Sequence, residues 1–215
     1  MPPRIDPSLV PAAPTLDFEA ALWAAGVEVV AGIDEAGRGA LAGPVYAGAV
    51  VLPNSMKVLH DLNGVRDSKE MLPEEREHWA IRIKAHARAW AVGCADAAEI
   101  DALGIVPATR LAACRALERM APAPDHLLID YLVLHEVPTP QTWLYKGDAR
   151  SLSIAAASVL AKTARDAQLV ALHQDFPDYG FAAHKGYGTA RHRQALADLG
   201  PCAQHRRSFA LTGQP

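Results

Sequence analysis

Two apolar segments, Val27 to Ile33 and Pro44 to Leu52, flank a short glycine-rich stretch and constrain the fold more than any other feature of the chain. Both have the apolar, partly β-branched composition of buried strands, and a connection this short predicts adjacent antiparallel strands. The first segment stops at Asp34 and Glu35. Consecutive strand residues point to opposite faces, so we expect the chain to turn there and bring both acids to one site.

Further apolar segments alternate with helical patterns along the rest of the chain. We expect helices at residues 18–25, from 73 onward, and at 107–120, 151–175 and 189–199, with strands at 90–95, 126–129 and 143–146. Three strands come first, and later strands alternate with helices. This order predicts an α/β fold, a mixed five-stranded sheet with helices on both faces.

The length of 215 residues fits one domain. We expect residues 1–20, which are rich in proline, to be a disordered tail, and residues 21–215 to form a single domain. The net charge of -3 excludes a uniformly basic surface, so binding to a polyanion needs local patches.

The three cysteines, Cys94, Cys114 and Cys202, form no C-x-x-C pair, which argues against a disulfide framework or a zinc site. No apolar run approaches the roughly 18 residues that span a bilayer. The N-terminus lacks the pattern of a secretion signal. We therefore expect a cytoplasmic protein that does not insert into membranes.

Acidic residues follow three of the predicted strands: Asp34 with Glu35, Asp130, and Asp148 just beyond Lys146. Ligand sites of α/β sheets form where strand ends and loops converge. Carboxylates gathered there repel one another, and a divalent cation such as Mg²⁺ or Mn²⁺ removes that penalty. The alternative is that these acids are helix caps and solvated strand ends, the commoner fate of a single aspartate.

The stretch from Gly37 to Gly43 fails the G-x-G-x-x-G dinucleotide pattern, because its last glycine comes one residue late and a strand follows. Glycines let a backbone approach a ligand closely, and exposed peptide groups here could bind a sugar hydroxyl or a phosphate. A tight hairpin turn without such a role explains the glycines equally well.

Taken together, these residues resemble the type 2 ribonucleases H, the ribonuclease HII family. The resemblance covers residues 27–210 and rests on motifs in the family's order. They are DEAGRG at 34–39, LAGPV at 41–45, DSK at 67–69, Asp130 after an apolar strand, KGD at 146–148, IAAAS at 154–158, AK at 161–162, RD at 165–166, HKGYGT at 184–189, and HR at 205–206 with Phe209.

The resemblance implies a ribonuclease H-like sheet and an endoribonuclease that uses Mn²⁺ or Mg²⁺. It identifies Asp34, Glu35, Asp130 and Asp148 as the catalytic and metal-binding acids. Gly37, Arg38 and Gly39 match the segment that reads the ribose 2′-hydroxyl. Tyr187 matches the tyrosine that stacks on the next deoxyribose, although from the sequence alone a core tyrosine is a comparable reading.

The implied substrates are RNA–DNA hybrid duplexes and DNA with embedded ribonucleotides, cut 5′ of the ribonucleotide to leave 5′-phosphate and 3′-hydroxyl ends. Two metal ions roughly 4 Å apart would bracket the scissile phosphate. We expect a monomer.

The chain departs from the family at two positions, with Ala40 where proline is usual and Tyr131 where glycine is usual. It ends soon after Phe209, without the C-terminal extension of longer members, and the absence of an N-terminal substrate-binding domain argues against the type 3 relatives.

Four other polar residues, Lys69, Lys146, Ser158 and Lys162, are expected to contact the substrate. Ser158 and Lys162 are four residues apart and share a helix face, but a solvated lysine is an equal alternative. Asp166 is either near the metals or structural. We expect Trp79, Trp90 and Trp143 in the core.

The C-terminal stretch is locally basic and predicts a patch that binds the nucleic-acid backbone, with a charged helix surface as the alternative. Its cations are Lys185, Arg191, Arg193, Arg206 and Arg207.

Two other functions remain open. A nuclease or phosphotransferase that acts on another substrate, such as a DNA junction, needs the acids but neither the Gly37–Gly39 turn nor Tyr187. A non-catalytic nucleic-acid-binding module leaves the acids unexplained, since without metal they would repel phosphate.

Overall fold

The computed structural model describes residues 10–211 and contains one five-stranded sheet in the order β3-β2-β1-β4-β5. The strands are β1 (Val30–Ala36), β2 (Val45–Val51), β3 (Ala89–Ala95), β4 (His126–Asp130) and β5 (Gln141–Leu144). β2 runs antiparallel to β1 and to β3, whereas β4 runs parallel to β1 and to β5. The predicted mixed sheet is therefore confirmed.

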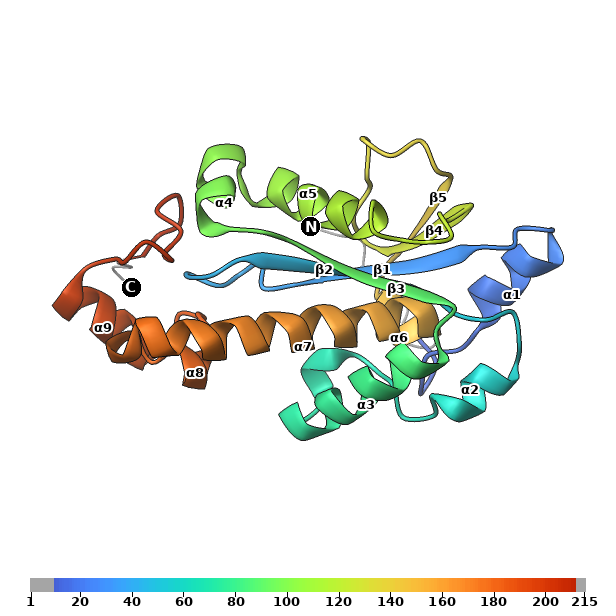
Figure 1. Ribbon diagram of the computed structural model, residues 1–215, viewed down its shortest axis with the longest axis horizontal. Helices are drawn as coiled ribbons and strands as arrows, with labels where there is room; N and C mark the ends of the chain where they lie inside the picture. The colour runs from blue at the N-terminus through green and yellow to red at the C-terminus, as the bar shows by residue number, and fades with distance from the viewer. Residues whose placement is uncertain (1–9, 212–215) are drawn as a thin grey trace.

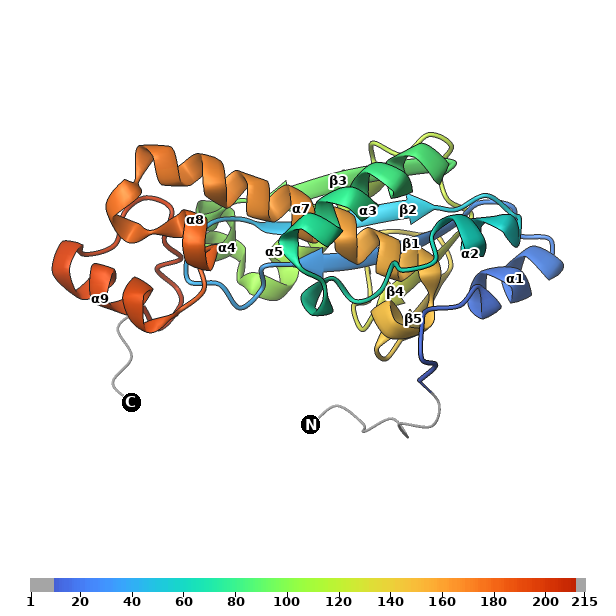
Figure 2. The ribbon, with the colours of Figure 1, turned by 90° about the horizontal axis from the view of Figure 1, so that it is seen from below.

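Helices cover both faces of this sheet (Figure 1). α4 (Ala97–Leu103) and α5 (Ile105–Leu117) lie on one face. The other face carries the long α7 (Leu152–Asp175), with α3 (Pro73–His86) beside it, as Figure 2 shows. The remaining helices are α1 (Asp17–Ala24), α2 (Lys57–Asp61), η2 (Ser68–Glu70), α6 (Gly147–Arg150), η3 (Pro177–Tyr179), α8 (Phe181–His184) and α9 (Ala190–Leu199).

Small residues allow α7 to pack unusually close to the sheet. A Cβ atom on Gly48 of β2 would lie 2.3 Å from the Ala157 carbonyl oxygen, and one on Gly32 of β1 would lie 2.2 Å from the Ser153 carbonyl carbon. Both approaches are too short for any residue except glycine. The close packing buries the first part of α7 and brings its side chains against the ends of β1 and β2.

The predicted disordered tail is wrong for its last residues. Thr15 pairs with Ser151, Leu16 is buried, and α1 begins at Asp17. Glu19 is buried because its Oε1 accepts hydrogen bonds from Ser151 and Ser153 at the start of α7. Residues 1–9 of the predicted tail lie outside the described residues.

Two of the three tryptophans expected in the core are exposed. Trp90 and Trp143 lie on β3 and β5, the two edge strands, where no neighbouring strand covers them. Trp79 packs partly buried against the core. No helix within residues 10–211 is both long enough and apolar enough to cross a bilayer.

Candidate active site

The predicted acids come from three elements that meet at one end of the sheet. Asp34 and Glu35 lie within β1, Asp130 is the last residue of β4, and Asp148 lies in the short helix α6. Two details of the prediction are therefore wrong. β1 continues through Ala36 instead of turning after Ile33, and β5 ends at Leu144, so Asp148 follows a helix start and not a strand end.

The strand pairing explains how neighbouring residues of one strand still reach one site. β4 pairs with β1 only as far as Ile33, opposite Ile129. Beyond Ile33 that edge of β1 is free, while the other edge stays paired with β2. Asp34 and Glu35 both line a cavity at this free edge, together with Asp130.

Asp34 is the most electrostatically strained of the four acids. It is only 2% exposed. Burial raises its pKa well above the usual value, and the charges of Glu35, Asp130 and Asp148 raise it further, whereas the nearby Ser158 hydroxyl lowers it. One carboxylate oxygen, Oδ1, accepts the Glu35 N–H at 2.7 Å. The other, Oδ2, is buried without a hydrogen-bond partner in the described part of the chain.

Asp130 and Asp148 share this environment. Burial raises the pKa of Asp130, although its Oδ1 accepts the Gly147 N–H at 2.7 Å. Burial and the charges of Asp130 and Asp67 raise the pKa of Asp148 to about 6. Carboxyl groups with raised pKa values in one cleft are typical of sites that bind a cation or transfer a proton.

The chemistry of these acids fits a hard divalent cation, because all of their donors are oxygens and Asp34 Oδ2 lacks a partner. Within residues 10–211, no three acidic, histidine or cysteine side chains already converge on a common ligand position. Glu35 accepts a hydrogen bond from Arg38 at 3.0 Å, and Asp130 accepts one from Gly147. These contacts hold the carboxylates apart, so an ion would have to draw them together.

Lys69 supplies positive charge to the same acids. Its Nζ lies 3.5 Å from Asp148 Oδ2 and 3.8 Å from Asp67 Oδ1. Burial alone would lower the pKa of Lys69, but the charges of Asp34, Asp67 and Asp148 outweigh it and raise the pKa. The side chain therefore stays protonated and lines the cavity beside Asp130.

The Gly37–Gly39 turn is held from behind by Arg206. This guanidinium is fully buried and donates three hydrogen bonds: Nη2 to the Gly37 carbonyl at 2.8 Å, Nη1 to the Arg38 carbonyl at 2.8 Å, and Nε to the Gly43 carbonyl at 2.9 Å. In a trans peptide the C=O and the following N–H point in opposite directions. The N–H groups of Arg38 and Gly39 therefore point away from Arg206, and both residues line the cavity.

Arg165, on α7, supports the neighbouring part of the same turn. It is buried and donates to the carbonyls of Pro44 at 3.0 Å and Ala42 at 3.2 Å. A Cβ on Gly37, which has a φ of +93°, would lie 1.9 Å from Arg165 Nε. Ala40 replaces the proline usual in the family without opening the turn, because its N–H donates to the Gly37 carbonyl at 3.3 Å.

Tyr187 lies at the far wall of the cavity, 36% exposed. The Lys162 ammonium lies 5.5 Å and the Arg165 guanidinium 5.2 Å from the centre of its ring. The cavity has a volume of about 620 Å³. It thus joins Asp34, Glu35 and Asp130, the turn and an exposed aromatic ring in one space, while Asp148 lines the adjoining cavity.

The other four predicted substrate contacts lie in three different settings. Lys69 and Lys162 line the cavity. Lys146 is exposed but lines a second, adjoining cavity instead. Ser158 is buried, where its hydroxyl contacts Ser68 at 2.9 Å and Asp34, so the prediction that it touches substrate is wrong.

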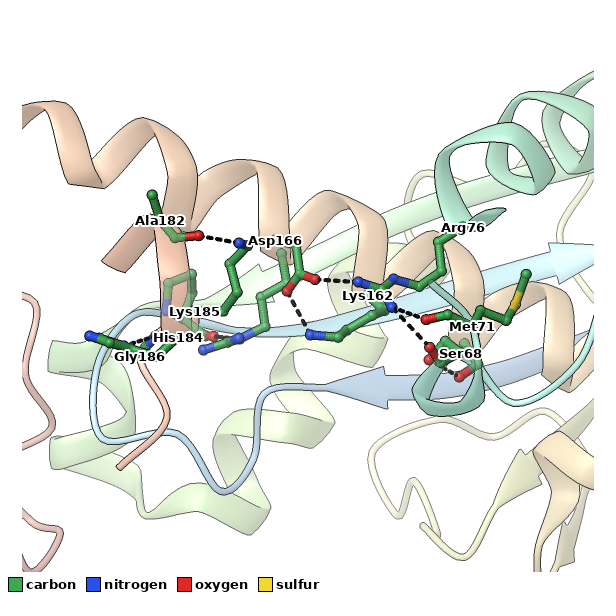
Figure 3. A network of polar contacts seen from close by, with 12 residues as sticks. Ser68, Met71, Arg76, Lys162, Asp166, Ala182, His184, Lys185 and Gly186 are labelled. Atoms are coloured by element: carbon green, nitrogen blue, oxygen red, sulfur yellow. Dashed lines mark hydrogen bonds and ion pairs between the residues drawn. The ribbon is translucent and has the colours of Figure 1, made fainter. Parts of the chain in front are cut away.

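Asp166 binds two positively charged side chains at the cavity wall, Arg76 and Lys162 (Figure 3). Its Oδ2 accepts Arg76 at 2.9 Å and its Oδ1 accepts Lys162 at 2.7 Å. Arg76 also donates to the carbonyls of Ser68 and Met71, which fixes η2 and with it the backbone of Lys69. Asp166 is thus a structural acid and not a partner of the four acids.

Sequence reasoning missed Arg76, Arg165 and the structural role of Arg206. The predicted basic C-terminal patch is wrong for Arg206, because its charge faces carbonyl groups in the interior. Arg191, Arg193 and Arg207 are exposed. No local signal in the sequence separates such a buried arginine from a solvated one, because its partners come from more than 160 positions earlier.

Comparisons with known proteins agree with this arrangement. The family model for Ribonuclease HII matches residues 31–212. The Ribonuclease HII of Synechococcus sp. (strain JA-3-3Ab) is 51% identical over 197 residues, which are 92% of this chain and 88% of the relative. The Ribonuclease HII of Syntrophotalea carbinolica is 50% identical and covers 90% of this chain and 91% of its own length.

Solved structures with the same fold include the RNase HII of Archaeoglobus fulgidus, determined in complex with PCNA. It has a TM-score of 0.71 and 25% identity, and the match covers 86% of this chain and 98% of that one. The ribonuclease H2 of Pyrococcus horikoshii OT3 matches with a TM-score of 0.68 and 24% identity, over 86% and 95% of the two chains.

Proposed function

The chain belongs to the ribonuclease HII family and is a ribonuclease H, and on that premise we propose the substrates and mechanism of its site. The enzyme cuts the RNA strand of RNA–DNA hybrids, and it cuts duplex DNA on the 5′ side of a single embedded ribonucleotide. The observation that carries the proposal is a single cavity lined by both Asp34 and the Gly37–Gly39 turn, whose Arg38 and Gly39 N–H groups point away from Arg206.

Asp34, Glu35, Asp130 and Asp148 would hold two divalent ions, Mg²⁺ or Mn²⁺. When bound there, such ions would supply activation of a water and stabilisation of the leaving oxygen, which would give 5′-phosphate and 3′-hydroxyl ends. The unpartnered oxygen of Asp34 supports this assignment. The chain's own contribution is to gather four carboxylates at one end of the sheet in a partly buried setting, from which a bound cation would draw them together.

Selection of RNA depends on the turn. The 2′-hydroxyl is the group that distinguishes ribose from deoxyribose. Within residues 10–211 the N–H groups of Arg38 and Gly39 donate to no backbone carbonyl, and Arg206 holds the carbonyls of Gly37 and Arg38 on the other side, so these N–H groups would donate to the 2′-hydroxyl. Tyr187 would stack on the deoxyribose of the following nucleotide, which fits its exposed position across the cavity.

Lysines along the cavity would bind the phosphates on either side of the cut. Lys69 and Lys162 both line the cavity, and so does Lys185 of the C-terminal segment. We propose further that residues 21–215 act as one catalytic domain, as a monomer in the cytoplasm. The three free cysteines are consistent with a reducing compartment.

The test uses a DNA duplex with one ribonucleotide, labelled at the 5′ end, incubated with the protein and Mg²⁺ or Mn²⁺. We expect one product that ends on the 5′ side of the ribonucleotide and no cutting in EDTA. Asp34→Asn and Asp130→Asn should remove turnover and leave the circular dichroism spectrum unchanged.

Three results would contradict the proposal. Equal cleavage of an all-DNA duplex would rule out recognition of the ribose and favour a nuclease of another specificity, such as one that acts on junctions. Binding without cutting would make the protein a nucleic-acid-binding module. Full activity of Asp34→Asn would remove that acid from the mechanism.

A further inference from the structure

Three aromatic rings form an exposed cluster beside the acids, and the proposed function gives them no role. Tyr131 follows Asp130 directly, and Trp143 and Tyr145 lie on and just after β5. The Tyr131 ring lies 6.5 Å from that of Trp143 and 6.1 Å from that of Tyr145, in edge-to-face arrangements with interplanar angles of 86° and 85°. Tyr131 is 50% and Trp143 is 54% exposed, so large apolar faces meet solvent.

The backbone of Tyr131 makes this exposure costly. Its φ of +52° lies in the left-handed region, which disfavours residues with a Cβ and suits glycine. The turn is fixed, because the Tyr131 N–H donates to the Leu144 carbonyl at 3.0 Å. A tyrosine is thus kept in a strained conformation although its ring is only half buried. Strain of this kind is found where a side chain serves a function.

A second cavity, of about 450 Å³, runs from the acids to this cluster. Asp148 lines it together with Tyr131, Tyr145 and Lys146. It adjoins the first cavity, because Asp130 and Lys69 line both. Tyr187 lines only the first. In Figure 1, α8 and α9 and the β4–β5 end of the sheet lie toward opposite sides of the molecule.

This arrangement fixes the direction of a bound strand. In the proposed function, the turn holds the ribonucleotide and Tyr187 holds the nucleotide on its 3′ side. The strand that precedes the cut phosphate must then continue past Asp130 in the other direction, into the second cavity. Lys146 and Arg66 line that cavity and can face phosphates. The Tyr131 and Tyr145 rings also line it and offer flat apolar surfaces to sugars and bases, and Trp143 lies beside Tyr131 at its edge.

We infer that Tyr131, Trp143 and Tyr145 form a binding subsite for the nucleotides on the 5′ side of the cut. The inference rests on the proposed function, from which it takes the direction of the bound strand. It extends that function from the ribonucleotide and its 3′ neighbour to a part of the substrate that neither the turn nor Tyr187 reaches.

The first experiment compares two duplexes that each contain one ribonucleotide. One has a long arm and the other a very short arm of DNA on the 5′ side of the cut. We expect Tyr131→Gly and Trp143→Ala each to raise KM for the long-arm duplex about tenfold, the usual effect of losing one aromatic contact to a nucleotide. The wild-type enzyme should already have a raised KM for the short-arm duplex, and the variants should add nothing to it.

Trp90→Ala is the matched control, because Trp90 is 39% exposed on β3, the opposite edge of the sheet. It should leave KM for both duplexes unchanged. A stability measurement separates binding from a structural role of Tyr131. Glycine relieves the strain at this position, so Tyr131→Gly should raise the thermal midpoint while it weakens binding.

Three outcomes would overturn the inference: an unchanged KM for the long-arm duplex in both cluster variants, an equal loss with both arm lengths, or a dimer of the wild type that Trp143→Ala dissociates. Fluorescence anisotropy of the labelled duplexes in EDTA keeps this test separate from the proposed function. If the wild type prefers the long arm in binding, the variants lose that preference, and nothing is cut in a parallel reaction with Mg²⁺ or Mn²⁺, the subsite stands and the proposed activity fails.

Discussion

Replacing Arg206 by methionine tests whether Arg206 holds the Gly37–Gly39 turn in the conformation proposed to bind the ribose 2′-hydroxyl. Methionine keeps much of the length of the side chain and removes every donor. The Gly37, Arg38 and Gly43 carbonyls then lose the charged partner that each now has at 2.8 to 2.9 Å. The Gly37 carbonyl keeps only the long hydrogen bond from the Ala40 N–H, and the Arg38 and Gly43 carbonyls regain partners only if the turn rotates toward solvent, which would reorient the Arg38 and Gly39 N–H groups.

The size of the effect follows from these three contacts. Hydrogen bonds from a charged donor contribute about 1.5 kcal/mol each at the low end of their range, so three contribute roughly 4 to 5 kcal/mol. Burial of the guanidinium offsets part of this, since burial and the neighbouring Arg165 charge lower the pKa of Arg206 to about 9. We expect the free energy of unfolding to fall by about 2 to 4 kcal/mol.

Activity should fall more selectively than stability. We expect kcat/KM for the single-ribonucleotide duplex to fall about a hundredfold, the usual effect of losing one preorganised donor. Arg206→Lys should recover only part of this, because a single ammonium cannot replace a planar fork with three directed donors. Urea denaturation gives the stability change, and initial rates on duplexes with and without the ribonucleotide give the selectivity.

Arg207→Met is the control, since the neighbouring side chain is exposed and hydrogen-bonds none of the turn. The reasoning fails if Arg206→Met loses stability but retains the wild-type preference for the ribonucleotide. In that case Arg206 would hold the fold together without orienting the amides.

Three further predictions concern other parts of the site. Asp34→Asn should abolish turnover yet raise the thermal midpoint of unfolding in EDTA, because it removes a buried carboxylate whose pKa is raised by burial and by the charge of Glu35. An unchanged midpoint would contradict the idea that this carboxylate destabilises the fold without metal. Tyr187→Ala should raise KM for the ribonucleotide junction about tenfold and Tyr187→Phe should not, because stacking needs the ring alone. Burial and the His192 charge lower the pKa of His205 to about 4, so protonation of His205 favours the unfolded state. Up to about 3 kcal/mol of the free energy of unfolding should therefore be lost as pH falls from 6.5 to 4. Urea titrations should show a flatter dependence of stability on pH for His205→Asn than for the wild type.

Most of the architecture could be predicted from the sequence, because its elements carry strong local patterns. The pairing of the first two strands, the long helix that ends at Asp175 and the mixed sheet all follow from apolar periodicity and turn residues. Strand ends could not be placed. β1 continues to Ala36 because β2 pairs with it along its full length, a partnership that overrides the preference of Asp34 and Glu35 for a loop.

Burial was harder to predict than secondary structure. Apolar patterns identify a strand but do not say whether it lies at the edge of a sheet, and for that reason the positions of Trp90 and Trp143 were wrong. Ser158 and Lys162 share a helix face, and for that reason both were expected to contact the substrate. α7 passes from the core to the cavity wall between them, so the two residues contact different surroundings.

The buried arginines also explain how a chain with a net charge of -3 can attract a polyanion to a cluster of acids. Arg165 and Arg206 lie behind the turn, and their hydrogen bonds go to carbonyls, with no carboxylate among their ion-pair partners in residues 10–211. Their charge is therefore not neutralised locally, and in a poorly screened interior it acts over a longer range than that of a surface lysine. The positive charge of Arg206 also polarises the Gly37–Arg38 and Arg38–Gly39 peptide groups whose carbonyls it binds, which makes the Arg38 and Gly39 N–H groups better donors. One pair of residues thus shapes the turn and supplies the positive potential that a phosphate needs beside four carboxylates.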